Sequence, residues 1–454
     1  MINFLPLGGA DEIGASSFYL NISGTGILLD CGIHPRKNGI EALPKFDLLN
    51  ELPLDYVFIS HDHQDHIGSL PFLIKKFPHV IVFTTTQTKE IAGITLHNAA
   101  NILTENLKDE NSFEIYTHDE IDLLVKSIRE VECDVPLIIK GLRHHGEEIK
   151  ITFIDAGHIL GSAGILIEHS GGKIFYTGDI NLSDQSIMIG ADLSGIKKLN
   201  ALIMETTYGA SDSEKIGSWI SESKRFTKAV NKILHKGGSI LIPVFALGKT
   251  QEILSMIYES MKKGELTETN IYGGGIGKEI SRVYDKSKFI TRRKDRDFEL
   301  KEIPQNDLFE IEDYNHFKKH PGIVLASSGM MIEGTSSFKL MKYWLDQKDF
   351  AIFGVGYMDP DTPGFKVINS KRGNKIHVTD FDEERNVNCE VERFYFPSHS
   401  KREDLLKIVE QTKPEKVILV HGEASAKNWV GKEILTTYKN IKVYAAEDCR
   451  GIFI

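Results

Sequence analysis

Residues 57–70 (VFISHDHQDHIGSL) constrain the fold of this chain more than any other stretch. They begin as an apolar, β-branched run typical of a buried strand, and residues 67–75 have the pattern of a helix. The loop between them carries candidate metal ligands: His61, His63, Asp65 and His66. Imidazole and carboxylate groups bind zinc and similar ions, so the two alternating histidines favour one ion and the next two residues a second. The alternative is a solvated polar loop.

Composition and charge limit the class of protein. The chain has 454 residues, 41% hydrophobic and 26% charged, which is enough for two or more domains. It shows no run of about 18 apolar residues and no basic leader, so we expect no membrane span and a cytoplasmic location. The four cysteines lack paired spacing, which argues against a disulfide framework. A net charge of −10 excludes a surface that binds nucleic acid as a whole.

Further candidate ligands lie at later strand ends. Asp30 follows an apolar run, and its roles as a turn residue and as a site residue are equally open. His158 lies in a Gly-Ala-Ser loop between two expected strands, and Asp179 ends the next strand. Together with the first cluster, they offer a third ligand for one ion and a carboxylate that can bridge two.

The second half of the chain alternates strands and helices, which predicts a parallel α/β layer. Residues 248–250 (GKT) resemble the end of a phosphate loop, but Pro243 stands where the first glycine belongs. Residues 272–279 (YGGGIGKE) lack the hydroxyl that should follow the lysine. We therefore reject both as nucleotide-binding loops, although their backbone N–H groups suit an isolated phosphate, as do those of residues 327–329.

Other polar features are interpreted as surface. The basic run 291–296 (TRRKDR) is typical of a solvated linker. His97 and His235 each lie in a helical pattern without a partner motif. His399, in PSHSKREDLL, and His421, at a strand end, remain as candidates for a site.

In chain order, these motifs resemble the metallo-β-lactamase superfamily, and within it the β-CASP branch of RNA-processing nucleases of the RNase J and cleavage-factor type. The resemblance covers nearly the whole chain. The residues at the positions of the superfamily's successive motifs are Asp30, His61, His63, Asp65, His66, His158 and Asp179. The additional β-CASP motifs take in Glu205, His399 and His421. Lys249 departs from a frequent arginine, and Ser398 from the usual alanine.

The resemblance implies a fold and a ligand set. The fold is α/β, an αββα sandwich made by residues 1–205 and 395–454, with an α/β β-CASP domain inserted at residues 206–394. The implied ligands are His61, His63 and His158 for one zinc and Asp65, His66 and His421 for the other, with Asp179 bridging them. Asp30 would orient a ligand. Manganese or another divalent ion is the alternative to zinc.

The function implied is hydrolysis of RNA phosphodiester bonds by a two-metal-activated hydroxide. Asp65 would accept a proton, and His399, held by Glu205, would protonate the leaving 3′ oxygen, giving 5′-phosphate and 3′-hydroxyl ends. The family's RNA-cleaving members carry a histidine at the position of His421, which favours RNA over DNA. Internal cutting and cutting from a 5′ end both remain open, as does a homo-oligomer.

The sequence gives weaker evidence for the residues that contact the substrate. The candidates are Lys249, Ser327, Ser328 and Gly329. Two other functions use parts of the same pattern: a metallo-hydrolase of a small ester or thioester, and a non-catalytic RNA-binding scaffold. The β-CASP motifs count against the first, and the complete ligand set counts against the second.

Overall fold

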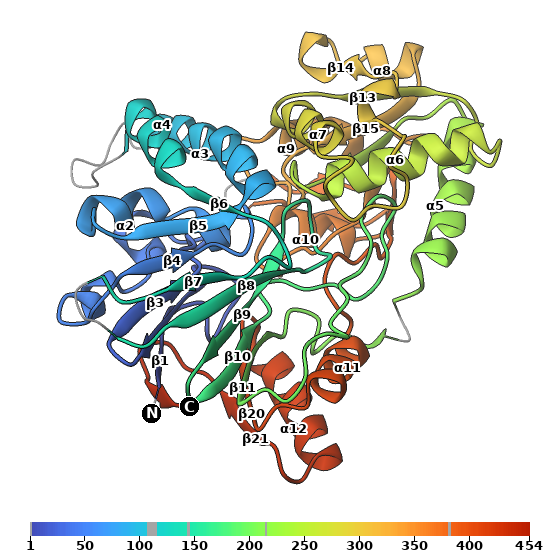
Figure 1. Ribbon diagram of the computed structural model, residues 1–454. Helices are drawn as coiled ribbons and strands as arrows, with labels where there is room; N and C mark the ends of the chain where they lie inside the picture. The colour runs from blue at the N-terminus through green and yellow to red at the C-terminus, as the bar shows by residue number, and fades with distance from the viewer. Residues whose placement is uncertain (1, 107–115, 143–145, 214–215, 380–382) are drawn as a thin grey trace. The chain divides into compact units, whose positions relative to one another are not determined.

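The computed structural model describes residues 2–106, 116–142, 146–213, 216–379 and 383–454. Contacts divide the chain into two compact units (Figure 1). Unit 1 comprises Met1–Ser183, Gly190–Ser213 and Ser398–Ile454, and unit 2 comprises Asp184–Ile189 and Glu214–Pro397. The domain limits expected at residues 205/206 and 394/395 stay a prediction. Among the described helices, none is long and apolar enough to cross a membrane.

The first sheet of unit 1 has seven strands in the order β22-β1-β2-β3-β4-β5-β6. Their bounds are β1 (Asn3–Gly8), β2 (Ser17–Ile22), β3 (Thr25–Leu29), β4 (Tyr56–Phe58), β5 (Ile81–Thr85), β6 (Arg129–Val131) and β22 (Ile452–Phe453). Pairing is antiparallel from β22 to β3 and parallel from β3 to β6. The carboxyl ends of β3 and β4 therefore lie side by side, which brings Asp30 next to the loop after residue 58.

The second sheet of unit 1 also has seven strands, in the order β21-β20-β11-β10-β9-β8-β7. Their bounds are β7 (Leu137–Ile139), β8 (Ile149–Asp155), β9 (Ala163–His169), β10 (Gly172–Tyr176), β11 (Ala201–Glu205), β20 (Lys416–Val420) and β21 (Lys442–Ala445). β10, β11, β20 and β21 run parallel, so the residues that follow β10, β11 and β20 gather at one edge. Asp179, Glu205 and His421 are there.

The two sheets of unit 1 pack face to face. Buried side chains of both, such as Phe18, Phe58, Phe153 and Tyr176, form one core. Helices cover the outer faces: α2 (Leu70–Lys76), α3 (Thr86–Asn106) and α4 (His118–Ser127) on the first sheet, α11 (Arg402–Thr412) and α12 (Ala424–Thr437) on the second. This layering confirms the predicted αββα sandwich.

Unit 2 contains a six-stranded parallel sheet in the order β14-β13-β15-β12-β16-β19. Its strands are β12 (Ile240–Pro243), β13 (Asn270–Gly273), β14 (Asn306–Asp307), β15 (Gly322–Ala326), β16 (Ala351–Gly354) and β19 (Glu390–Arg393). Its helices are α5 (Trp219–Leu234), α6 (Lys249–Lys262), α7 (Ile276–Lys286), α8 (His316–Lys319), α9 (Ser336–Leu345) and α10 (Pro363–Ile368). β17 (Lys375–Ile376) and β18 (Arg385–Asn386) form a separate pair. Unit 2 is thus the predicted inserted α/β layer.

Candidate metal centre

The histidine-rich loop lies between β4 and a short helix, α1 (Gln64–Ile67). Helix formation begins at Gln64, three residues before the predicted start, because the carbonyl of His63 accepts hydrogen bonds from the N–H groups of His66 and Ile67. His63 itself keeps extended backbone angles. The turn therefore directs Asp65 and His66 away from the two histidines that precede it, which produces two sets of ligands from six residues.

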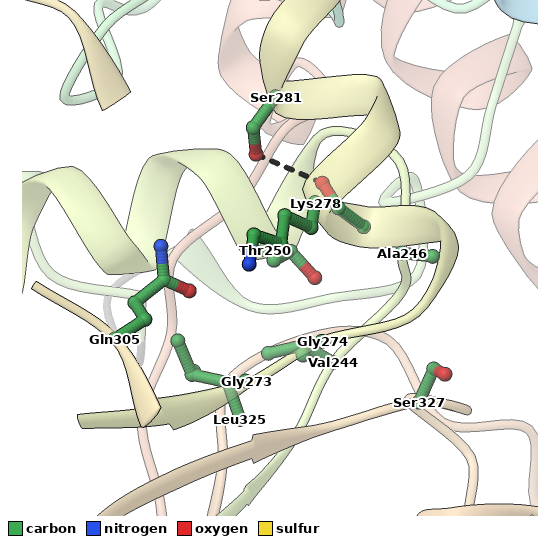
Figure 2. A pocket seen from close by; sticks show the side chains of 11 residues that line it. Val244, Ala246, Thr250, Gly273, Gly274, Lys278, Ser281, Gln305, Leu325 and Ser327 are labelled. Atoms are coloured by element: carbon green, nitrogen blue, oxygen red, sulfur yellow. Dashed lines mark hydrogen bonds between the residues drawn. The ribbon is translucent and has the colours of Figure 1, made fainter. Parts of the chain in front are cut away.

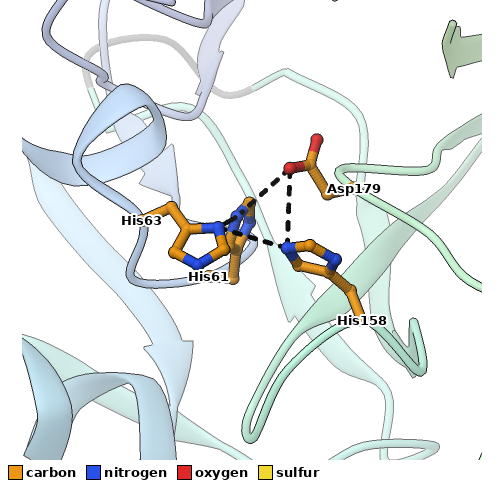
Figure 3. Close-up of side chains that lie close together, drawn as sticks. All are labelled: His61, His63, His158 and Asp179. Atoms are coloured by element: carbon orange, nitrogen blue, oxygen red, sulfur yellow. Dashed lines mark hydrogen bonds and ion pairs between the residues drawn. The ribbon is translucent and has the colours of Figure 1, made fainter. Parts of the chain in front are cut away.

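One set contains three imidazoles and a carboxylate: His61, His63, His158 and Asp179 (Figure 3). The His63 Nδ1 atom lies 3.2 Å from the Nε2 atoms of both His61 and His158. Two nitrogens on one tetrahedral zinc, each bound at about 2.0 to 2.1 Å, lie roughly 3.3 Å apart. The spacing of these nitrogens therefore fits one metal ion.

The second set contains Asp65, His66 and His421. The His421 Nε2 atom lies 3.3 Å from Asp65 Oδ2, and the His66 Nε2 atom lies 3.9 Å from the same oxygen. His421 follows β20 and has a positive φ of 47°, while its N–H donates to the carbonyl of Gly9. A ligand from the far end of the chain thus completes a set that the loop begins.

Asp179 faces both sets. Its Oδ2 lies 3.5 Å from His61 Nε2 and 3.7 Å from His158 Nε2, whereas its Oδ1 lies 3.3 Å from His66 Nε2 and 3.3 Å from His421 Nδ1. One oxygen is directed at each set, which is the arrangement that a bridging carboxylate requires. The position of Asp179 agrees with the role inferred from sequence, and that role remains a proposal.

Two fully buried atoms at this junction, His66 Nε2 and Asp179 Oδ1, lie 3.3 Å from each other, but neither makes a hydrogen bond of good geometry. Leaving such atoms unsatisfied costs about 1 to 3 kcal/mol each, so a buried pair of this kind usually serves another ligand. Both atoms belong to the set of candidate donors. The donor chemistry and the close approach of these buried donor atoms together fit metal binding.

Hydrogen bonds on the far ring nitrogens orient three of the imidazoles. His66 Nδ1 lies 2.7 Å from Asp30 Oδ2, and His158 Nδ1 lies 2.7 Å from the carbonyl of Ser398. Since both oxygens only accept, each Nδ1 carries a hydrogen, and the ring is held with its Nε2 directed at the site. His61 Nδ1 similarly donates to the Ser60 hydroxyl, whose own hydrogen goes to Asp30.

Asp30 is the buried hub of this network. Its carboxylate accepts from the Ser60 N–H at 2.6 Å, the Ser60 hydroxyl at 2.7 Å and the Tyr176 hydroxyl at 2.6 Å, besides His66. The residues alone leave Asp30 open between a turn and a site role, and the resemblance implies that it orients a ligand, which stays a prediction. Ser60 and Tyr176 were missed altogether, because hydroxyls at strand ends carry no signal of their own.

The electrostatics keep the first set and both carboxylates in the forms that bind cations. Burial lowers the pKa of His61 and His158 well below the usual value, and more modestly that of His63, so the rings stay neutral. Burial alone would raise the pKa of Asp65 and Asp179, but neighbouring imidazoles outweigh it and hold both below the usual range. Neutral imidazoles and ionised carboxylates are the ligand forms. At His66, burial alone would lower the pKa, but Asp179, Asp65 and Asp30 outweigh it and raise the pKa well above the usual value, so a metal would have to displace a proton from this ring.

A third group adjoins the first set: Asp179, Glu205 and His399. His399 Nδ1 lies 3.1 Å from Glu205 Oε1 and 3.3 Å from Oε2, so it donates to the carboxylate and leaves Nε2 available. The Ile180 N–H in turn donates to Glu205 at 2.8 Å. Burial opposes a charge on His399, yet Glu205 and Asp179 outweigh it and raise its pKa.

The predicted substrate contacts lie in unit 2 and are less well defined. Lys249 is buried, and its ammonium donates to the carbonyl of Phe396. Ser327 is exposed, Ser328 is half-buried and Gly329 is buried, all directly after β15. A direct contact between Lys249 and phosphate stays a prediction, since its ammonium is engaged inside unit 2.

Ser327 lines a small polar pocket in unit 2 (Figure 2). The sequence indicated only a glycine-rich turn in this region and no pocket. The pocket lies where β12, β13 and β15 end and α7 begins, and it is also lined by Thr250, Gly274, Lys278 and Gln305. The exposed Lys278 supplies a cation beside these polar groups.

Comparison with known proteins gives three matching families. Residues 19–208 match the Metallo-beta-lactamase superfamily domain, residues 250–367 the Beta-Casp domain, and residues 384–446 the Zn-dependent metallo-hydrolase RNA specificity domain. A solved structure, a protein of unknown function from Enterococcus faecalis, shares the fold at 14% identity with a TM-score of 0.58, over 100% of both chains.

Curated relatives match over almost the entire chain. Cleavage and polyadenylation specificity factor 73 of Drosophila melanogaster is 32% identical over 93% of this chain and 60% of its own length. Endoribonuclease YSH1 of Candida glabrata is 28% identical over 97% of this chain and 57% of its own length. Integrator complex subunit 11 of Danio rerio is 28% identical over 95% of this chain and 71% of its own length. The chain thus spans less than two thirds of the length of the first two of these relatives.

The relatives correct the predicted cellular location. Cleavage and polyadenylation factors and Integrator subunits are nuclear RNA-processing factors. The prediction of a cytoplasmic location is therefore wrong. It rested on the lack of a signal peptide and of an apolar span, and these two features do not distinguish the cytoplasm from the nucleus.

Proposed function

Because this chain belongs to the β-CASP branch of the metallo-β-lactamase superfamily, we propose that it is a metal-dependent endoribonuclease. The observation that carries the proposal is the convergence of two candidate ligand sets on Asp179, with the His399–Glu205 pair beside them. His399 and His421 both lie within the segment that matches the RNA-specificity family. Relatives named as endoribonucleases support internal cutting of RNA rather than cutting from an end.

We assign His61, His63 and His158 to one zinc ion, Asp65, His66 and His421 to a second, and Asp179 to both. When bound, such ions lower the pKa of a water and offset negative charge on phosphate oxygens. The imidazole-rich set suits zinc best, while manganese is the alternative at the set that contains Asp65. Asp30 orients His66 of the second set directly and His61 of the first set through the Ser60 hydroxyl.

In this proposal, two side chains move protons. Asp65, held ionised beside His66 and His421, accepts a proton from the attacking water. His399 donates the proton of its Nε2 to the leaving 3′ oxygen, because Glu205 binds the other ring nitrogen and fixes the ring. The products would be a 5′-phosphate and a 3′-hydroxyl.

RNA is the proposed substrate, and unit 2 supplies candidates that bind its phosphates: Ser327, Ser328, Gly329 and Lys249, together with Lys278 of the pocket. Backbone N–H groups at the start of helices bind phosphate oxygens well. The relatives' names describe subunits of larger assemblies, so we also propose that this chain acts within one. A homo-oligomer stays a prediction.

A circular RNA tests the proposal directly. The chain is stripped of metal, reloaded with Zn²⁺ or Mn²⁺, and incubated with circular RNA and with a linear 5′-monophosphate RNA of the same sequence. We expect the circle to open, since internal cutting needs no free end, and the fragments to carry 5′-phosphates. An intact circle beside a shortened linear RNA would indicate exonuclease action, and no cleavage of either RNA by the metal-loaded chain would refute the function.

A further inference from the structure

A second group of imidazoles lies away from the metal centre, between α3 and α4 of unit 1. His97 and Asn101 are four residues apart on α3, and His118 and Asp122 are four residues apart on α4. Residues four apart share one face of a helix. The two pairs face each other, because every hydrogen bond described below crosses from one helix to the other.

The two imidazoles meet edge to edge in nearly parallel planes, with ring centroids 4.9 Å apart and an interplanar angle of 12°. His97 Nε2 lies 3.1 Å from Asp122 Oδ1, and His118 Nε2 lies 3.1 Å from Asn101 Oδ1. The Nδ1 atoms of the two rings lie only 2.6 Å apart.

These contacts determine which ring nitrogens carry hydrogen. A carboxylate oxygen and an amide oxygen only accept, so the Nε2 atoms of His97 and His118 are both donors. In neutral rings, both Nδ1 atoms are then unprotonated. Two lone pairs therefore point at each other across 2.6 Å, which is unfavourable unless a cation lies between or beside them.

We propose that His97 and His118 form a separate binding site for a transition-metal ion such as Zn²⁺, Ni²⁺ or Cu²⁺. Imidazole suits these ions, and an oxygen acceptor on the far nitrogen of each ligating ring is their usual support. The metal centre shows the same construction at His66 and His158, whose far nitrogens bind Asp30 and a carbonyl. The site does not depend on the proposed ribonuclease activity.

Distance and exposure set the character of this site. Two nitrogens on a tetrahedral zinc stay roughly 3.3 Å apart, so binding would widen the pair by about 0.7 Å and turn the two rings until both lone pairs are directed at the ion. The His97 side chain is 30% exposed and Asp122 is 58% exposed, so solvent can complete the coordination. We therefore expect weaker and more readily exchanged binding than at the buried centre.

The site would link α3 to α4, and α3 also contacts the metal-binding loop. Thr95, two residues before His97, donates its hydroxyl to Asp62 Oδ2 at 2.7 Å, and Asp62 lies between His61 and His63. An ion on His97 and His118 would therefore stabilise the helix that supports this loop. The expected effect is on stability, since neither histidine belongs to the ligand sets described above.

Calorimetric titration of the zinc-loaded full chain with Ni²⁺ tests the proposal, with metal analysis to verify that the bound zinc is retained. We expect one Ni²⁺ per wild-type chain, and none for His97→Ala or His118→Ala. Asn101→Ala should weaken binding by about 10- to 100-fold, since it removes an oxygen that orients a ligand. His235→Ala is the matched control, because that exposed ring bonds to the carbonyl of Asn231 in the preceding helix turn and should leave Ni²⁺ binding unchanged.

Thermal unfolding gives a second measurement. Ni²⁺ should raise the Tm of the wild type and of His235→Ala, but not of His118→Ala. Equal Ni²⁺ binding by the wild type and His118→Ala would overturn the proposal. So would no Ni²⁺ binding by the wild type, which would leave a shared proton as the occupant of the pair.

Discussion

The metal centre of unit 1 and the glycine-lined pocket of unit 2 both lie at strand ends, but they are built differently. At the metal centre, three of the imidazoles make a hydrogen bond through the ring nitrogen that faces away from the site, and five of the seven ligand residues are buried, while His63 and Asp65 are half-buried. The pocket of unit 2 is lined largely by glycines and hydroxyls, with the exposed Lys278 as its cation. Metal coordination demands particular side chains, whereas a phosphate contact through backbone N–H groups demands only a suitable turn.

The largest effect is expected at Asp179, the carboxylate directed at both ligand sets. Asp179→Asn should lower the metal content and reduce RNA cleavage by about a thousandfold or more. The reason is that bound metal ions stabilise the charge of the transition state by several kcal/mol, and Asp179 is proposed to hold both ions. Metal analysis and cleavage of labelled RNA measure the two effects. Asp47→Asn, at a highly exposed carboxylate, is the matched control and should change neither. Full metal content and activity in Asp179→Asn would remove the bridging role.

His399 should separate chemistry from metal binding. His399→Ala is expected to retain both metals and lose about 10²- to 10⁴-fold in the rate of cleavage, the usual contribution of a general acid. Single-turnover cleavage alongside metal analysis distinguishes this variant from Asp179→Asn. If His399→Ala loses metal as well, the residue supports the centre rather than the leaving group.

Unit 2 has its own buried charges, and their effect should appear in stability. Burial raises the pKa of Glu252 from 4.5 to about 7, although the N–H groups of Ile187 and Met188 donate to its carboxylate. Between these values the folded state binds the extra proton, so the stability of unit 2 should fall as pH rises from 4.5 to 7, by about 3 kcal/mol.

Lys249 gives the opposite sign at higher pH. Burial lowers its pKa from 10.5 to about 8, so stability should rise with pH between these values, because the unfolded chain binds the extra proton there. Urea unfolding at half-unit pH steps should therefore show a minimum between pH 7 and 8. Glu252→Gln should abolish the fall in stability between pH 4.5 and 7. Glu259→Gln, which changes a more exposed carboxylate of the same helix, should leave that fall unchanged. A wild-type stability that does not change between pH 4.5 and 7 would contradict the raised pKa of Glu252.

The smallest effect is expected from the pocket of unit 2. Lys278→Gln should raise KM for RNA by about threefold with kcat unchanged, because one exposed charge is worth well under 1 kcal/mol. Steady-state kinetics at two salt concentrations measure the change, with Lys263→Gln as the control at an exposed lysine of the same unit. An unchanged KM would exclude the pocket from substrate binding.

Much of the metal centre could be predicted because its residue types are rare and its motifs are short. His61, His63, Asp65 and His66 lie within six residues, and the resemblance connected them to the distant His158, Asp179 and His421. The layered αββα fold was implied by the family resemblance that the same motifs carry. Hydroxyl partners such as Ser60 and Tyr176, and the carbonyl of Ser398, have no comparable signature, so only contacts in space identify them.

The sequence by itself determined the types of ligand and the alternation of strands and helices, because coordination chemistry and side-chain periodicity act on neighbouring residues. The tertiary structure alone decided the rest. It assigned one oxygen of Asp179 to each ligand set, buried Lys249 against a carbonyl, and brought His97 of α3 to within 2.6 Å of His118 of α4. Those outcomes depend on packing between segments far apart in the chain, and no local pattern records them.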